Sequence, residues 1–238
     1  MMNLIDEGGK RLDGRLFDQL RPFSMQAGLL KSASGSAYIE QGGNKILVGV
    51  YGPRDSRSRY GTNQDKAVLR CRYHMLPFST EERKSPQPSR REIEISKVIR
   101  DALEPALLLE EFPRSVIDIY IEVLQSDGGS RGASITAASI ALADAGIPMK
   151  DLVSAVAVGK VNGRLVLDLS DTEDKEGEVD LPIAVMLNSG LITLMQMDGK
   201  LSEDEFRQAI DLAMAGAKEL REAQRKALMQ KYFKEVDS

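Results

Sequence analysis

The sequence predicts an α+β fold, with helices and strands layered as in α/β proteins, in two halves that meet near Lys150. Residues 67–75 and 115–124 alternate apolar with polar side chains, which is typical of half-buried strands. Between them, apolar residues recur at helical spacing after the breaker sequence SPQPS at 85–89. Strands and a long helix follow again after residue 150, so we expect both kinds of layer in both halves.

The first half is expected to begin with an arm and a hairpin. Residues 11–28 mix charged residues with Leu and Phe without a clean period, which predicts an irregular arm with one short helical turn at 16–20. Two apolar runs flank the turn sequence QGGN at 41–44, so we expect a β-hairpin there. The arginine-rich residues 54–66 predict an exposed loop.

Two helices complete this half. Ser89 and Glu92 fit a capping box, and the buried stripe of the helix that follows would include Ile93 and Ile95, with Pro105 bending or ending the helix. The second helix is expected to follow the glycines at 128 and 129, and the sequence AGIP at 145–148 should stop it.

The second half is expected to alternate strands with tight turns before one long helix. Asn162-Gly163 is a strong hairpin signal, and the acidic sequence at 170–178 predicts a loop before the strand that contains residues 179–188. Ser202 and Glu205 form a second capping box, which predicts a helix that reaches about Tyr232.

The segment 127–145, DGGSRGASITAASIALADA, is the strongest candidate for a binding site. Two glycines permit backbone angles at which peptide N–H groups converge, and the helix start adds free donors and the positive end of its dipole. This combination favours an anion such as phosphate, with the Ser130 hydroxyl and the Arg131 guanidinium completing the cradle. The residues alone leave open a plain helix start in which the glycines only turn the chain.

Arginines elsewhere suit a phosphodiester backbone. Arg90 and Arg91 open a helix, where cations oppose the dipole, and such a pair can contact a phosphodiester backbone or simply form a solvated basic face. Arg57 and Arg59 lie in the predicted loop, which either captures a polyanion or is an ordinary exposed loop.

Carboxylates are concentrated between residues 168 and 180. Most of them are expected only to solvate a loop, because bringing several together is costly unless a proton or a divalent cation intervenes. Asp174 and Asp180 are spaced so that both can face one cleft. Opposite an anion cradle, one such carboxyl group could protonate a leaving oxygen or hold Mg²⁺.

Composition narrows the class of protein further. The 238 residues carry a formal net charge of −4, which argues against a chain that coats nucleic acid indiscriminately but permits a local basic track. One cysteine excludes an internal disulfide framework. The single histidine, His74, is expected to pack or to form a hydrogen bond rather than to catalyse, which argues against most mechanisms that need a histidine. We expect a cytoplasmic protein without a secretory leader or a membrane span.

Taken together, several segments resemble the RNase PH family, and especially its catalytic exosome-type members. The matching segments are RLDGR at 11–15, PSRREIEISKVIRDALEP at 88–105, DGGSRGASITAASIALADAGIP at 127–148 and LDLSDTEDKEGEVDLPIAV at 167–185. The resemblance implies the RNase PH-like fold: two βαβ-containing halves packed together (1–150 and 151–238), with mixed sheets and helices on one face.

The resemblance also implies a function. Members of the family are 3′→5′ exoribonucleases that use inorganic phosphate in place of water, release nucleoside 5′-diphosphates, and can run backwards as RNA-tailing enzymes. Exosome-type members alternate with a non-catalytic RNase PH-type paralogue in a hexameric ring that degrades single-stranded RNA and carries RNA-binding cap subunits. A non-catalytic RNA-binding ring subunit is the main alternative, and a small-molecule kinase is a more distant one.

Carried over residue by residue, the resemblance assigns four sets of roles. Gly129, Ser130 and Arg131 would hold phosphate; Arg90 and Arg91 would grip the RNA 3′ end; Arg57 and Arg59 would line the entry pore; and Asp174 and Asp180 would serve in catalysis and as ligands of Mg²⁺ or another divalent cation.

Two positions depart from the patterns of related enzymes. Bacterial members usually have Thr where this chain has Ser130, which keeps the hydroxyl. Polynucleotide phosphorylases have Lys two positions after the second aspartate, where this chain has Pro182, so any metal site here lacks that neighbour.

Overall fold

The computed structural model of the chain describes residues 4–6, 8–55 and 63–233. The first half contains strands β1 (Phe23–Ala27), β2 (Gly35–Gln41), β3 (Asn44–Asp55), β4 (Val68–Met75) and β5 (Ser115–Gln125), with helices α1 (Arg90–Leu103) and α2 (Ser130–Asp144). The second half contains β6 (Val153–Val161), β7 (Arg164–Leu167), α3 (Asp171–Glu176), β8 (Val179–Met186), β9 (Leu191–Met195), β10 (Asp198–Gly199) and α4 (Glu203–Tyr232).

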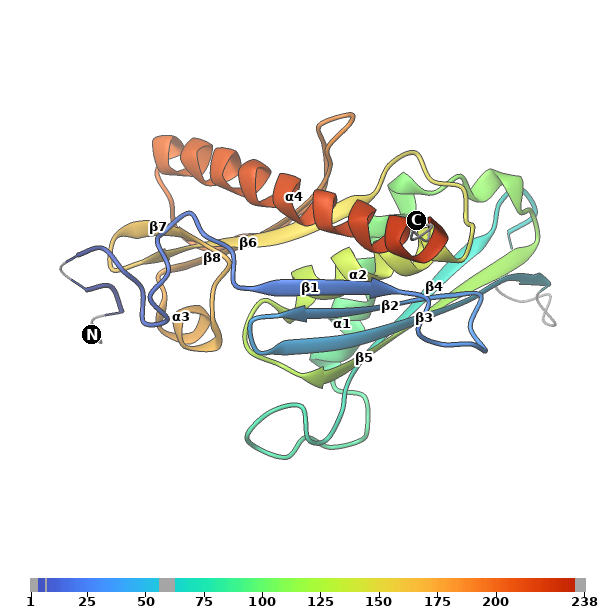
Figure 1. Cartoon of the computed structure of the whole chain (residues 1–238), viewed down its shortest axis with the longest axis horizontal. Helices are drawn as coiled ribbons and strands as arrows, with labels where there is room; N and C mark the ends of the chain where they lie inside the picture. The colour runs from blue at the N-terminus through green and yellow to red at the C-terminus, as the bar shows by residue number, and fades with distance from the viewer. Residues whose placement is uncertain (1–3, 7, 56–62, 234–238) are drawn as a thin grey trace, which may run out of the picture.

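Each half forms a five-stranded sheet (Figure 1). The first has the order β1-β2-β3-β5-β4 and is mixed, because β4 and β5 run parallel and are joined through α1 while the other pairs are antiparallel. In the second, β10-β8-β6-β7 with β9 beside β8, every described strand pair is antiparallel. The predicted α+β class, helices with two sheets, is confirmed, although only the first sheet is mixed.

The turns and helix ends follow the local signals in the sequence. The β2–β3 hairpin closes at Gln41 and Asn44, and the β6–β7 hairpin turns through Asn162 and Gly163, whose φ angles of 47° and 75° suit a type I′ turn. The capping boxes of α1 and α4 are both formed. Helix α1 ends at Leu103, two residues before Pro105, because proline removes a backbone donor and clashes with the preceding turn.

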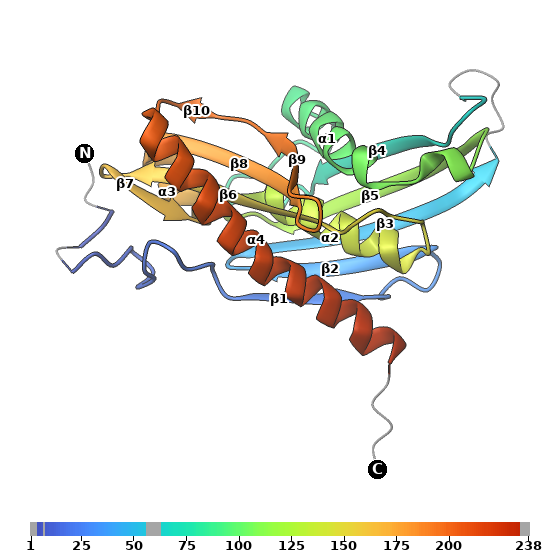
Figure 2. The same cartoon turned by 90° about the horizontal axis from the view of Figure 1, so that it is seen from above.

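Helix α2 lies between the two sheets and is buried on nearly all sides. It packs on β2 and β3 on one side and on β6 on the other, while α4 crosses β6 and β1 beside it (Figure 2). Polar groups fasten it: the Val153 amide donates to the Ser139 hydroxyl over 2.9 Å, and Gln224 of α4 donates to the carbonyl groups of Thr136 and Val153 over 2.9 and 3.0 Å. The two halves therefore share one core.

Three local predictions were wrong. The arm is not irregular to its end, because β1 pairs with β2 and buries Met25. The acidic loop contains the helix α3, which a capping box of Ser170 and Glu173 opens. Ile93 is 63% exposed on α1, since the buried stripe continues from Glu92 and Ile95 instead.

Among the described residues, no helix has an apolar stretch long enough to cross a membrane.

Candidate active site

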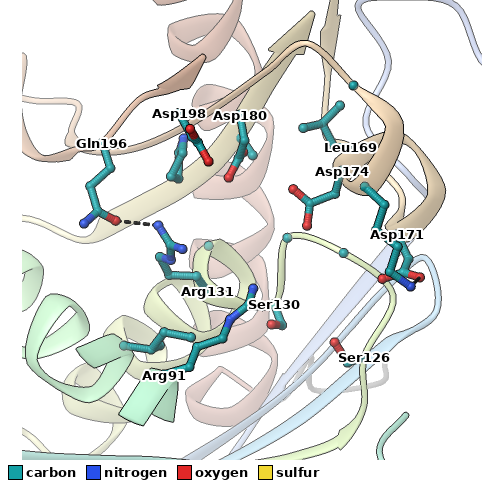
Figure 3. Close-up of a pocket in the computed structure, with 18 of the residues that line it drawn as sticks. Arg91, Ser126, Ser130, Arg131, Leu169, Asp171, Asp174, Asp180, Gln196 and Asp198 are labelled. Carbon is teal, nitrogen blue, oxygen red and sulfur yellow. Dashed lines mark hydrogen bonds and ion pairs between the residues drawn. The ribbon is translucent and has the colours of Figure 1, made fainter. Parts of the chain in front are cut away.

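A cavity of about 840 Å³ opens where the two halves meet. Its walls include six of the residues predicted from the sequence: Arg91, Gly129, Ser130 and Arg131 from the first half, and Asp174 and Asp180 from the second (Figure 3). The anion cradle and the paired carboxylates, which lie far apart in the sequence, therefore share one cavity.

The two arginines at the start of α1 differ in whether they reach the cavity. Arg91 lines the cavity, whereas Arg90 does not, because successive residues of a helix point in directions about 100° apart. The backbone here is fixed by Glu92, whose carboxylate accepts the amides of Met75 and Ser89 over 2.8 and 2.6 Å. Arg57 and Arg59 lie outside the described residues, so their predicted place at a pore stays a prediction.

The glycine loop is built for close approach of backbone to backbone. Gly128 and Gly129 have φ angles of +66° and +64°, and Gly129 is the N-cap of α2. A Cβ at Gly128 would lie 2.6 Å from the carbonyl carbon of Ser170, just before α3. The loop of the first half therefore touches the start of the helix that carries Asp174, and only glycine fits there.

Neighbouring side chains orient the two polar groups of the cradle. The Tyr73 hydroxyl lies 2.9 Å from Ser130 Oγ, and Arg131 Nη1 donates to the side-chain oxygen of Gln196, which follows β9 in the second half (Figure 3 shows the second contact). Tyr73 and Gln196 were not among the predicted site residues. No local sequence pattern predicts their roles. Tyr73 reaches the cavity because β4 passes beside it, and Gln196 does so because it lies in the β9–β10 connection.

The carboxyl groups of the cavity are partly buried and crowded. Burial raises the pKa of Asp180 to about 6, helped by the negative charges of Asp174 and Asp198 and opposed by Arg131. Burial also raises the pKa of Asp174, with Arg91 opposing the shift. Asp198 faces Asp180 across the β8–β10 pair and lines the same cavity, although the sequence only predicts a turn there. The carboxyl groups of this cavity therefore keep a proton, or attract a cation, more readily than exposed aspartates do.

This crowding predicts a stability change that does not depend on any reaction. Because the folded-state pKa of Asp180 lies above the ordinary 3.8, the folded protein binds its proton more tightly, and the stability from this group is lost as the pH rises through about 6. We expect Asp180→Asn to raise the unfolding free energy at pH 7.5 by about 1–2 kcal/mol, discounted for partial exposure.

The measurement is denaturant unfolding at pH 4 and pH 7.5 in buffer free of phosphate and divalent cations, with the exposed Asp211→Asn as the control for net charge. The gain should shrink toward pH 4. A loss of stability at pH 7.5, or a gain that is equal at both pH values, would contradict the electrostatic account of the cavity.

Buried ion pairs beneath the cavity join the N-terminal arm to the second half. Arg11 contacts Glu173 through two hydrogen bonds of 2.7 and 2.5 Å, and Glu173 directly precedes Asp174 on α3. Arg21 donates to Asp168 over 2.7 and 3.1 Å and also to the Asp127 and Gly128 carbonyls of the glycine loop. These pairs fix both walls of the cavity.

This network is not evident from the sequence. The arm carries Arg11, Arg15 and Arg21 among apolar residues, but nothing local reveals that Arg11 and Arg21 pair with buried carboxylates more than 140 residues away.

Carboxylate is the cavity's main potential metal ligand. In the part of the chain that the structure describes, no group of three or more His, Cys, Asp or Glu side chains is arranged to hold a metal ion. Asp174 and Asp180 would therefore supply two protein ligands at most with the remaining positions left to water or substrate oxygens, which is how Mg²⁺ is commonly bound.

Models of the 3′ exoribonuclease (RNase PH) family match both halves of the chain, with domain 1 at residues 19–148 and domain 2 at residues 151–216. The chain is 59% identical over 233 residues to exosome complex component Rrp41 of Thermococcus kodakarensis, a match that covers 98% of this chain and 94% of that protein. It is 56% identical over 232 residues to Rrp41 of Nitrosopumilus maritimus, covering 98% and 95%.

Two solved structures share the fold. Rice Rrp46 matches with a TM-score of 0.83 at 27% identity and covers 92% of this chain and 100% of that chain. A chain of the Archaeoglobus fulgidus exosome with RNA bound to the active site matches with a TM-score of 0.79 at 25% identity and covers 90% and 92%.

Proposed function

Because the chain belongs to the RNase PH family of 3′ exoribonucleases, we propose that it is the catalytic subunit of an exosome ring that shortens single-stranded RNA by phosphorolysis. The observation that carries this proposal is the single cavity, which combines an anion cradle of Gly129, Ser130 and Arg131 with the carboxyl groups of Asp174 and Asp180. A phosphate nucleophile and a proton donor are the two components that phosphorolysis requires in one place.

In the proposed reaction the cradle seats inorganic phosphate beside the last phosphodiester of the RNA. Arg91, from the cavity wall, holds the backbone at the 3′ end through guanidinium–phosphate contacts, and Arg90, which precedes it on α1 outside the cavity lining, contacts the same RNA strand from there. A phosphate oxygen attacks the terminal phosphorus, and the bond to the 3′-oxygen of the preceding nucleotide breaks. The products are a nucleoside 5′-diphosphate and an RNA that is one nucleotide shorter with a free 3′-hydroxyl.

Asp174 is proposed to supply the proton that the departing 3′-oxygen needs. Its raised pKa keeps a larger protonated fraction than an ordinary aspartate has, and the same is true of Asp180. The larger shift falls on Asp180, so the two carboxyl groups are best treated as a pair that shares this duty. The same acid becomes the base when the reaction runs backwards as RNA tailing.

The donor set also fits a divalent cation. Asp174 and Asp180 would hold Mg²⁺ or a similar ion, which would neutralise charge on the phosphate groups when bound. Arg131 and Arg91 already supply positive charge on the other side of the cavity.

The wider assembly is proposed from the family resemblance. We propose that the chain alternates with a non-catalytic RNase PH-type paralogue in a hexameric cytoplasmic ring with RNA-binding cap subunits, with Arg57 and Arg59 at its pore. The two halves, 1–150 and 151–238, are proposed as its domains. In such a ring the modest net charge of −4 is no obstacle, because only the shared channel needs to be basic.

The proposal predicts that RNA decay depends on phosphate. The ring assembled with its paralogue should shorten a 5′-labelled single-stranded RNA and release nucleoside diphosphates only when phosphate is added, and nucleoside diphosphates should extend the RNA in the reverse direction. RNA binding that is indifferent to phosphate, without any shortening, would instead identify a non-catalytic ring subunit.

A further inference from the structure

A second hydroxyl group lies beside the proposed phosphate cradle. The phenol oxygen of Tyr73 is 2.9 Å from Ser130 Oγ, and both residues line the cavity. Tyr73 is only 2% exposed and belongs to β4, whereas Ser130 is the first residue of α2. The contact therefore joins two elements that meet only through tertiary packing.

The direction of this hydrogen bond decides what Ser130 can do. A serine hydroxyl has one proton to donate and two lone pairs that accept, so it can accept from one partner while it donates to another. Burial raises the pKa of the Tyr73 phenol, which keeps it protonated and able to donate. When the phenol donates to Ser130 Oγ, the serine proton is left for an acceptor in the cavity.

The backbone that carries Tyr73 is held in place, so its phenol oxygen has a fixed position beside Ser130. Its backbone N–H donates to the Ser96 hydroxyl over 2.8 Å, and that hydroxyl donates to the Glu92 carbonyl over 2.6 Å. The Met75 amide donates to the Glu92 carboxylate over 2.8 Å. Strand β4 is thus fastened to the first turns of α1 at Tyr73 and two residues after it, so the phenol approaches Ser130 from a fixed backbone.

We propose that Tyr73 is a positioning residue that turns the Ser130 hydroxyl proton toward the bound phosphate and so tightens phosphate binding. The inference rests on the proposed function, because it takes phosphate as the occupant of the cradle. Tyr73 does not itself touch phosphate in this account; it acts through Ser130.

The test measures phosphate dependence in the ring assembled with its paralogue. Tyr73→Phe removes only the hydroxyl, and we expect the KM for phosphate to rise about threefold to tenfold, the loss of one ordinary hydrogen bond, with kcat nearly unchanged. Tyr120→Phe is the matched control, since Tyr120 lines a separate pocket on the other side of the same sheet. Its KM for phosphate should stay at the wild-type value.

A double-mutant cycle separates positioning from a general structural effect. If Tyr73 acts through Ser130, adding Tyr73→Phe to Ser130→Ala should leave the KM for phosphate where Ser130→Ala alone puts it. An equal further rise in the Ser130→Ala background, or an unchanged KM in the single variant, overturns the inference.

The rise in melting temperature that phosphate alone produces provides a second readout, and it should shrink in Tyr73→Phe but not in Tyr120→Phe. A shift of the same size in both variants overturns the inference. Failure of the proposed function is distinguishable, because the wild-type ring would then show no dependence on phosphate at all.

Discussion

Replacing Asp174 with asparagine is expected to slow phosphate-dependent nucleotide release from the assembled ring by about 10²–10⁴-fold, the usual contribution of a positioned acid. The amide has nearly the same shape as the protonated carboxyl group but cannot give up a proton to the leaving 3′-oxygen. Single-turnover release of nucleoside diphosphate, measured at saturating phosphate and RNA, checks this directly.

Asp171→Asn is the matched control, because Asp171 lies on the same helix and the same cavity wall but is paired with Lys175 over 2.5 Å. It should reduce the rate by far less than Asp174→Asn. An undiminished rate in Asp174→Asn would refute the assignment of acid chemistry to this residue.

Removing the Arg21 side chain is expected to lower the unfolding free energy by about 3–5 kcal/mol, because the buried carboxylate of Asp168 loses its nearest ion-pair partner. The same change frees the carbonyl groups of the glycine loop that Arg21 contacts, so phosphate binding should weaken too. Denaturant unfolding of Arg21→Ala measures the first effect. The exposed pair of Arg100 and Asp101 supplies the control, since Arg100→Ala should cost at most about 1 kcal/mol.

The loss in Arg21→Ala should also depend on pH. Arg21 holds the pKa of Asp168 below its usual range, so the stability from this pair is present above the ordinary aspartate pKa and is lost as the pH falls through the depressed value. The difference between wild type and variant should therefore be largest near neutral pH and shrink in acid. A penalty that stays the same size at every pH would mean that Arg21 acts through packing alone.

Local chemistry explains which parts of the fold could be predicted. The Asn162-Gly163 turn and the Ser89 and Ser202 capping boxes depend only on neighbours within a few residues, so a short stretch of sequence is enough to predict each of them. The glycines and the helix start at 127–145 indicated an anion cradle, and the family resemblance, confirmed by both domain matches, pointed to Asp174 and Asp180; the structure brings these residues to one cavity.

What escaped prediction depends on contacts between distant segments. Arg21 meets Asp168 across 147 positions, and Gln196 reaches Arg131 across 65, so no window of sequence contains either pair. Short elements were also missed: β1 has five residues and α3 has six, too few to display a convincing period. The residues that hold the site in shape were therefore harder to foresee than those proposed to perform its chemistry.

The central claim is that free phosphate, seated by Ser130 and Arg131, becomes part of the product. The most direct test supplies the assembled ring with ³²P-labelled inorganic phosphate and an unlabelled single-stranded RNA, and analyses the released nucleotides. The account predicts nucleoside diphosphates that carry the label in their β-phosphate. Release of unlabelled nucleoside monophosphates, at a rate that does not change when phosphate is withheld, would contradict it.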